Sequence, residues 1–177
     1  MYAAITGWGH YAPEKILTNA DLEKIVETND EWIQSRTGIK RRHIAAPGQA
    51  TSDMATRAAL LALEEAGLTA KDIDLIVVAT TSPDLLLPST AALVQTRLDA
   101  SQAGAFDMNA ACCGFLYALS AVSAMVRGGG VRRVLLCGAE TLSSYLNWED
   151  RNTCVLFGDA AGAVIVEASA QPRGLQS

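Results

Sequence analysis

The part of the sequence that decides the fold is Phe106-Asp107-Met108-Asn109-Ala110-Ala111-Cys112-Cys113-Gly114-Phe115. Its first residues complete a strand-like segment, 103–108, and its last residues open an apolar, helix-like segment, 112–127. A strand that passes through small residues directly into a helix is one step of an alternating α/β fold. Cys112 would begin that helix, where the helix dipole and unpaired N–H groups favour the reactive thiolate.

The residues of this turn leave two questions open. Free cysteines are common core residues, so Cys112 and Cys113 could be small hydrophobes instead of nucleophiles. Adjacent residues on a helix point about 100° apart, so only one of the two can face a given pocket. The pattern alone does not say which one does.

Outward from this turn, strand-like and helix-like segments alternate along the chain. Such alternation predicts parallel pairing with right-handed crossovers, and therefore an α/β fold with a helix-covered mixed sheet. Thr18, Thr28 and Thr51 are expected N-caps, and Gly67 is an expected C-terminal cap. The expected strands are 3–8, 39–45, 74–80, 103–108, 131–138 and two within 153–166 joined by a turn at 158–162; the expected long helices are 51–67, 88–98 and 112–127.

Composition excludes several classes of function. The net charge of −5 over 177 residues argues against nucleic acid as the main partner. The longest apolar stretch, 110–126, is shorter than the roughly 20 residues that a membrane span needs, and no signal peptide is visible after Met1. The four cysteines form no C-x-x-C pair and lie apart from both histidines, so we expect no metal site, and we expect reduced thiols in the cytoplasm.

Four basic residues cluster in this acidic chain: Arg36, Lys40, Arg41 and Arg42. A solvated surface is the ordinary interpretation of such a cluster. A site for phosphate or an acidic carrier protein is the other, because a guanidinium donates paired hydrogen bonds. Trp32 lies four residues before Arg36, on the same helix face, and could stack an adenine or simply pack in the core.

The segment 106–115 resembles the nucleophile segment of ketoacyl synthase III, in the thiolase superfamily. The resemblance covers essentially all 177 residues, and its other matching segments follow in order at 11–13, 18–22, 30–33, 36–39, 42–45 and 157–163. It implies a thiolase-like fold in which 1–177 is the nucleophile-bearing N-terminal half, βαβαβαββ, with a mixed five-stranded sheet. The chain would then stop where a second, C-terminal half should start, after a turn at 172–174 and the beginning of a strand at 175–177.

The resemblance also implies roles for single residues. Cys112 matches the acyl-accepting cysteine, and Cys113 stands where the family usually has alanine or another small residue. Trp32 and Arg151 match residues that flank the coenzyme A adenine. The remaining matches are Thr28, which contacts the nucleotide; Arg36, which holds phosphates; Leu142 and Phe157, which line the acyl pocket; and Leu87, which the partner subunit inserts into that pocket. Leucine in place of the familiar phenylalanine at 87 suggests a primer somewhat larger than acetyl.

The implied activity is the initiation of fatty-acid synthesis by an acyltransferase that needs no cofactor besides its substrates. Acyl-CoA would acylate Cys112, and malonyl on acyl carrier protein would then condense with loss of carbon dioxide. The family takes a histidine and an asparagine from its second half, and neither His10 nor His43 matches that histidine. We therefore expect this chain alone to be inactive in condensation, and an isolated half to expose an apolar face that invites association.

Two alternatives remain open. One is a starter-unit synthase of a polyketide or quinolone pathway, or another condensing enzyme of the same superfamily. The other is a non-catalytic scaffold half, although a cysteine at 112 argues against a purely structural role. The intact enzyme is expected to be a homodimer that pairs the strand near Ala105 to Met108 across a two-fold axis.

Overall fold

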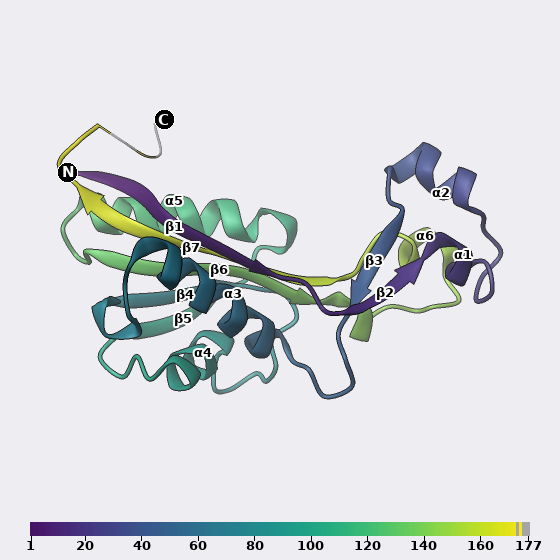
Figure 1. Cartoon of the computed structure of the whole chain (residues 1–177), viewed down its shortest axis with the longest axis horizontal. Coiled ribbons are helices and arrows are strands. Elements are labelled where there is room, and N and C mark those ends of the chain that lie inside the picture. Colours follow the sequence, from purple (N-terminus) through teal and green to yellow (C-terminus); the bar gives the residue numbers. More distant parts are fainter. Residues whose placement is uncertain (173, 175–177) are drawn as a thin grey trace.

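The computed structural model describes residues 1–172 and 174, arranged around one mixed five-stranded sheet (Figure 1). The strand order is β1-β7-β6-β4-β5. β4 pairs in parallel with β5 and β6, whereas β7 is antiparallel to β6 and β1. The predicted mixed five-stranded sheet is therefore confirmed. Its strands are β1 (Tyr2–Tyr11), β4 (Leu75–Ala79), β5 (Gly104–Met108), β6 (Arg133–Thr141) and β7 (Asp159–Ser169).

Helices cover both faces of this sheet. The run Leu75–Ala79 is buried throughout because its alternating side chains point to opposite faces. Ile76 and Val78 pack with α3 (Thr51–Ala66) and α4 (Thr90–Leu98), whereas Leu75 and Val77 pack with α5 (Gly114–Arg127). Figure 1 shows α5 along one face and α3 with α4 along the other.

Two glycines in β1 let α3 approach the sheet closely. A Cβ atom at Gly7 would lie 2.3 Å from the Ala62 carbonyl oxygen, and one at Gly9 would lie 2.3 Å from that of Ala58. Real Cβ atoms do not come so close to backbone, so both positions need glycine. The small residues of α3 complete this contact, since Ala58 and Ala62 are fully buried.

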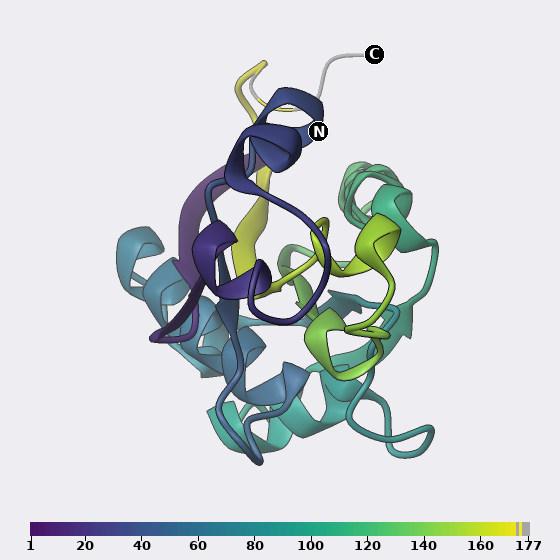
Figure 2. The ribbon, with the colours of Figure 1, turned by 90° about the vertical axis from the view of Figure 1, so that its right-hand side faces the viewer.

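A smaller lobe extends beyond one end of the sheet (Figures 1 and 2). It holds a two-stranded antiparallel sheet of β2 (Lys15–Thr18) and β3 (Arg41–Ile44). Three short helices surround it and share a separate core of Leu22, Ile33, Cys154 and Val155. These helices are α1 (Asn19–Leu22), α2 (Asp30–Thr37) and α6 (Arg151–Cys154).

Several expected details are wrong. Residues 153–166 do not form two strands, because α6 ends at Cys154 and β7 is one strand from Asp159 to Ser169. The small residues expected to turn at 158–162 instead continue the sheet, where β1 and β6 on either side satisfy their backbone groups. The four-residue strand β2 was missed. The strand expected at 175–177 and the middle of the turn at 172–174 lie outside the described residues.

The N-caps also differ in part from those expected. Thr18 caps α1 by accepting a hydrogen bond from the Asp21 amide. The cap of α2 is Asn29, not Thr28, and that of α3 is Ala50, not Thr51. Thr51 is the first helical residue, and its hydroxyl donates to the Ser82 carbonyl at 2.6 Å instead. Gly67 is confirmed as a left-handed cap, with φ 66°.

Candidate functional site

The turn between β5 and α5 presents a thiol on strained backbone. β5 ends at Met108, and Ala111 adopts a left-handed φ of 47°. This conformation costs an L-residue roughly 1–2 kcal/mol, and such strain tends to collect at functional sites. The residues Ala111–Cys113 form one 3-10 turn, and the regular helix begins at Gly114. Cys112 therefore lies just before α5, not within it as expected.

The four cysteines fall into two groups. Cys112 and Cys113 are exposed, whereas Cys137 and Cys154 are fully buried. Burial raises the pKa of the Cys137 thiol to about 12, and burial followed by the charge of Asp150 raises the pKa of Cys154. A protonated buried thiol is a poor nucleophile. Exposure thus leaves the two thiols at the turn as the accessible nucleophiles.

The sheet topology brings the other predicted acyl-pocket residues to the same edge as Cys112. The carboxyl ends of the parallel strands β4, β5 and β6 lie at one edge of the sheet, and Cys112 and Leu142 directly follow two of them. Leu142 opens a 3-10 turn, η3 (Leu142–Ser144). Phe157 precedes β7, whose first residue Asp159 pairs with Thr141 at the end of β6. Leu142 and Phe157 are both half-buried.

Two guanidinium groups contact the Trp32 ring in the smaller lobe. The Cζ atom of Arg36, one helical turn along α2, is 4.5 Å from the centre of the indole ring. The Cζ atom of Arg151, from α6, is 5.0 Å from it. Arg151 also donates to the Glu27 carbonyl at 3.2 Å. Two cations against one half-buried aromatic ring make a site that suits a flat base with attached phosphates.

Thr28 adds an unused hydroxyl beside this group. Asn29 accepts the hydrogen bond from the Trp32 amide at 2.7 Å, so the cap of α2 does not need Thr28. The buried Thr28 Oγ1 atom has no hydrogen-bond partner among the described residues. A buried hydroxyl without a partner costs about 1–3 kcal/mol, which a ligand could recover.

Leu87 does not line a pocket of its own chain. It is 83% exposed in the loop between β4 and α4, beside Leu86, which is 92% exposed. The peptide bond between Leu87 and Pro88 is cis. This loop is anchored at its start, where the Thr81 amide donates to Glu140 at 2.8 Å, and at its end, where the Thr90 amide donates to Asp107 at 2.7 Å.

Comparison with known proteins finds one family model and many similar proteins. A family model described as 3-Oxoacyl-[acyl-carrier-protein (ACP)] synthase III matches residues 106–177. A protein of Xanthomonas oryzae named beta-ketoacyl-[acyl-carrier-protein] synthase III is 61% identical over 168 residues, which are 95% of this chain and 52% of that protein. The chain is therefore similar to proteins named beta-ketoacyl-ACP synthase III, over about half of their length. It spans about half the length of the curated relatives that it matches.

Solved structures of similar synthases superpose closely on this chain. The 3-oxoacyl-ACP synthase III of Aquifex aeolicus superposes with a TM-score of 0.93 at 52% identity, covering 96% of this chain and 55% of that one. The priming ketosynthase of the R1128 polyketide pathway gives a TM-score of 0.93 at 37% identity, over 97% of this chain and 51% of that one. The predicted thiolase-like fold of the ketoacyl synthases is thereby confirmed.

Three buried or half-buried polar residues of this chain were missed as site-building residues. Arg42 was grouped with the surface cations, yet it is 4% exposed and donates to the Val155 carbonyl and, at 2.6 Å, to Asn19 Oδ1. Buried Asp159 accepts hydrogen bonds from the Ala45 and Ser143 amides at 2.7 and 2.8 Å. Glu140 accepts hydrogen bonds from the amide and the hydroxyl of Thr81, and so anchors the loop that carries Leu86 and Leu87. For Glu140 and Asp159, a polar residue beside an apolar strand run was the available signal.

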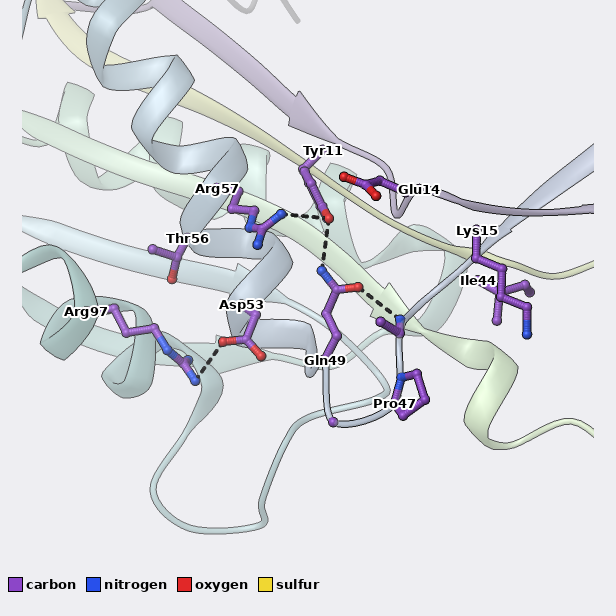
Figure 3. Close-up of a pocket in the computed structure, with 12 residues that line it drawn as sticks. Tyr11, Glu14, Lys15, Ile44, Pro47, Gln49, Asp53, Thr56, Arg57 and Arg97 are labelled. Carbon is purple, nitrogen blue, oxygen red and sulfur yellow. Dashed lines mark hydrogen bonds and ion pairs between the residues drawn. The ribbon is translucent and has the colours of Figure 1, made fainter.

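A separate polar groove of about 680 Å³ lies beside α3 and contains none of the predicted site residues (Figure 3). The Arg57 guanidinium donates to the Tyr11 hydroxyl at 2.8 Å, and Gln49 donates to the same oxygen at 3.0 Å. Arg97 pairs with Asp53 at 3.1 Å. These polar groups largely satisfy one another, which supports a structural role for the groove.

Two further searches covered residues 1–172 and 174. Within them, no cluster of three or more histidine, cysteine or acidic side chains has a geometry that could hold a metal ion. None of the helices there has both the length and the apolar character that crossing a membrane requires.

Proposed function

We propose that this chain is the nucleophile-bearing half of a beta-ketoacyl-ACP synthase III that initiates fatty-acid synthesis, with Cys112 as the acyl acceptor. The observation that carries the proposal is the turn at Ala111–Cys113, which presents an exposed thiol between β5 and α5. Relatives that bear this enzyme's name are about 60% identical along nearly the whole chain. We place the enzyme in the cytoplasm, in keeping with its free cysteines.

The reaction has two stages in this proposal. The Cys112 thiolate attacks the carbonyl carbon of acyl-CoA; a new carbon–sulfur bond forms, the bond to coenzyme A breaks, and its thiolate leaves. Malonyl-ACP then loses carbon dioxide, and the electron pair left on carbon attacks the enzyme thioester, which releases the Cys112 thiolate. The developing enolate needs hydrogen-bond donors that this chain does not supply through its histidines, since the family takes them from its other half.

Acyl-CoA would be held in the smaller lobe. The indole of Trp32 and the guanidinium of Arg151 would flank the adenine, which requires Arg151 to move off the ring that it now contacts. Arg36 would bind the phosphates through paired hydrogen bonds. The unpartnered Thr28 hydroxyl supports a contact with the nucleotide.

The length of the primer that the enzyme accepts would depend on the size of the acyl pocket and on the residue that the second subunit inserts into it. Leu142 and Phe157 would line the pocket, and Leu87 would enter it from the other copy of a homodimer. Two observations support this arrangement: Leu87 is exposed at a loop tip, and β5 is an edge strand of the sheet, with its outer side open to pairing.

Replacing Leu87 by phenylalanine should narrow the primer range of the complete enzyme. The larger ring would fill space that a longer acyl chain needs, so we expect kcat/KM for butyryl-CoA to fall about tenfold relative to acetyl-CoA. Steady-state rates with acetyl-, butyryl- and branched acyl-CoA measure it. A wild-type enzyme that already accepts acetyl alone would contradict the proposed pocket size.

A second candidate is a synthase that primes a polyketide pathway. The R1128 priming ketosynthase supports it, because its likeness to this chain is as close in fold, although its sequence identity is lower than that of the Aquifex enzyme. The carrier protein accepted in the second stage would separate the two.

Intact mass spectrometry tests the first stage directly. The chain and a version extended through the C-terminal half are incubated with acetyl-CoA and longer acyl-CoAs, beside a Cys112→Ala control. We expect one acyl group on Cys112 in the extended protein and none in the control. A folded extended protein that takes no label from any acyl-CoA would overturn the condensing function and favour a scaffold role.

A further inference from the structure

The turn before α5 carries a second thiol that the proposed reaction does not use. Cys113 is exposed and free, as is Cys112, and the two are neighbours in the same 3-10 turn. The remaining cysteines are buried and cannot reach this turn without unfolding. The chain therefore offers one accessible pair of adjacent thiols.

The spacing of this pair limits what can bridge it. Consecutive Cα atoms across a trans peptide are about 3.8 Å apart, whereas disulfides usually span about 4.4–6.8 Å. Among the described residues the only cis bond is Leu87–Pro88, so the bond between Cys112 and Cys113 is trans. A direct sulfur–sulfur bond would strain this turn. A single atom held between the two sulfurs lengthens the bridge, so the two side chains can both reach it without facing the same pocket.

Because only two thiols are present, the bridging atom must be one that needs no more than two protein ligands. A structural zinc ion needs four ligands, and no third metal-binding side chain stands near this pair among the described residues. Thiolate sulfur prefers soft, polarisable acceptors. An arsenic(III) atom that already carries one organic substituent needs only two sulfurs to complete its bonding.

We propose that Cys112 and Cys113 form a two-sulfur binding site for trivalent arsenic, as arsenous acid or an organic arsenical. With a reagent written R–As(OH)₂, two arsenic–oxygen bonds break and two arsenic–sulfur bonds form. Each thiol proton leaves with a hydroxide, so two water molecules are released and no electron is transferred. The flanking side chains are small, since Ala110 and Ala111 precede the pair, and they leave room for the substituent.

The site rests on the two thiols and not on the proposed acyl transfer. If Cys112 is the acyl acceptor, arsenic bound to its sulfur would also prevent acylation. The alanine that the family usually has at 113 would leave one sulfur only, and a single arsenic–sulfur bond exchanges readily with free monothiols.

Phenylarsine oxide tests the proposal on the chain as it stands. The protein is treated with one equivalent of reagent and challenged with excess glutathione, and the adduct is then measured by intact mass. Cys113→Ala and Cys113→Ser remove the second sulfur, Cys112→Ala removes the first, and Cys137→Ala is the buried control. Circular dichroism establishes that each variant is folded.

We expect each wild-type chain and each Cys137→Ala chain to bind one arsenical. Cys112 and Cys113 should then no longer react with maleimide. The adduct should survive glutathione and be released by dimercaptopropanol, while variants at 112 or 113 should lose at least nine-tenths of it. Equal retention by the single-thiol variants, or one arsenical bridging two chains, would overturn the proposal. Acyl labelling of Cys112 is scored separately, so failure of the proposed function remains distinguishable from failure of this site.

Discussion

Trp32 is the residue whose surroundings most directly suggest a ligand. Two guanidinium groups lie within 5.0 Å of its ring centre, yet neither carries a carboxylate partner among the described ion pairs. Charges held against an aromatic ring without a neutralising acid are well placed to receive phosphate. The sequence placed Trp32 and Arg36 on one helix face; Arg151, more than 100 residues away, could be added only through the family resemblance.

Replacing Trp32 by alanine should weaken coenzyme A binding about tenfold in the extended protein. Stacking of a base on an aromatic side chain contributes about 1–3 kcal/mol, and tenfold corresponds to about 1.4 kcal/mol. Isothermal titration with coenzyme A measures the change. Trp8→Ala is the matched control, because Trp8 is 61% exposed on β1. An equal loss in both variants would count against a stacking role for Trp32.

Cys137 should make the chain less stable in alkali. Its folded pKa is about 12, against 9.0 for an ordinary thiol, so the unfolded chain releases a proton that the folded chain retains. This contribution to stability is complete below pH 9 and is lost as the pH rises from about 9 to 12. Between about pH 8 and pH 10 it should lower the free energy of unfolding by about 1.4 kcal/mol.

Urea unfolding of wild type and Cys137→Ala at both pH values isolates this term. The alanine variant is expected to start less stable, because it leaves a small cavity, and to fall by about 1.4 kcal/mol less between the two pH values. Cys113→Ala, at an exposed position, should follow the wild type. Parallel curves for wild type and Cys137→Ala would show that the buried thiol does not titrate in this way.

At the scale of elements, β3 and the segment after α6 are joined by a buried cation. Arg42 donates to the Val155 carbonyl and to Asn19, and neither acceptor is charged. Burial lowers the pKa of this guanidinium, which remains protonated. Because the contact fixes the chain just before Phe157, it links the smaller lobe to one wall of the predicted acyl pocket.

Arg42→Ala should destabilise the protein by about 2–4 kcal/mol, since it removes the hydrogen bonds to the Val155 carbonyl and to the Asn19 Oδ1 atom and opens a cavity. Arg41→Ala is the neighbouring control; Arg41 is exposed, and its loss should change the free energy of unfolding by less than about 0.5 kcal/mol. Urea denaturation measures both. Similar effects of the two substitutions would refute the anchoring role of Arg42.

Much of the element pattern could be read from the sequence, for identifiable reasons. The buried strand at 75–79, the helix at 51–66 and the strand-to-helix turn at Cys112 have strong apolar periodicity or clear caps. The strand at 159–169 was misread because glycine and aspartate are ordinary turn residues, and only pairing with β1 and β6 makes this segment an inner strand of the sheet. The polar contacts of Asp159 and Arg42 join segments more than 100 residues apart, which no local pattern reports.

The whole molecule leaves one apolar helix face uncovered. On α5, Leu116, Tyr117 and Met125 are 65%, 60% and 41% exposed. Exposed large apolar side chains on one helix offer apolar contacts to another chain. The resemblance to a two-half enzyme predicts such an apolar face, and the chain spans about half the length of its relatives.

The isolated chain should therefore self-associate, and Leu116→Glu should weaken that association at least tenfold by placing a charge in the apolar contact. Sedimentation velocity over a range of protein concentrations measures it. Leu60→Glu is the control on α3, where Leu60 is 54% exposed on the other side of the sheet. A chain that stays monomeric at high concentration would contradict the prediction.

The position of β7, between β1 and β6 in the sheet, has a consequence for synthesis on the ribosome. The first strand of the chain pairs only with β7 in the large sheet, from Tyr2 opposite Ser169 to Tyr11 opposite Ala161. Translation proceeds at about 5–20 residues per second, so the amino-terminal strand waits several seconds for its partner to leave the exit tunnel. During that interval its backbone groups and Trp8 are open to other chains. A strand left unpaired in this way is exposed to aggregation until β7 has been made.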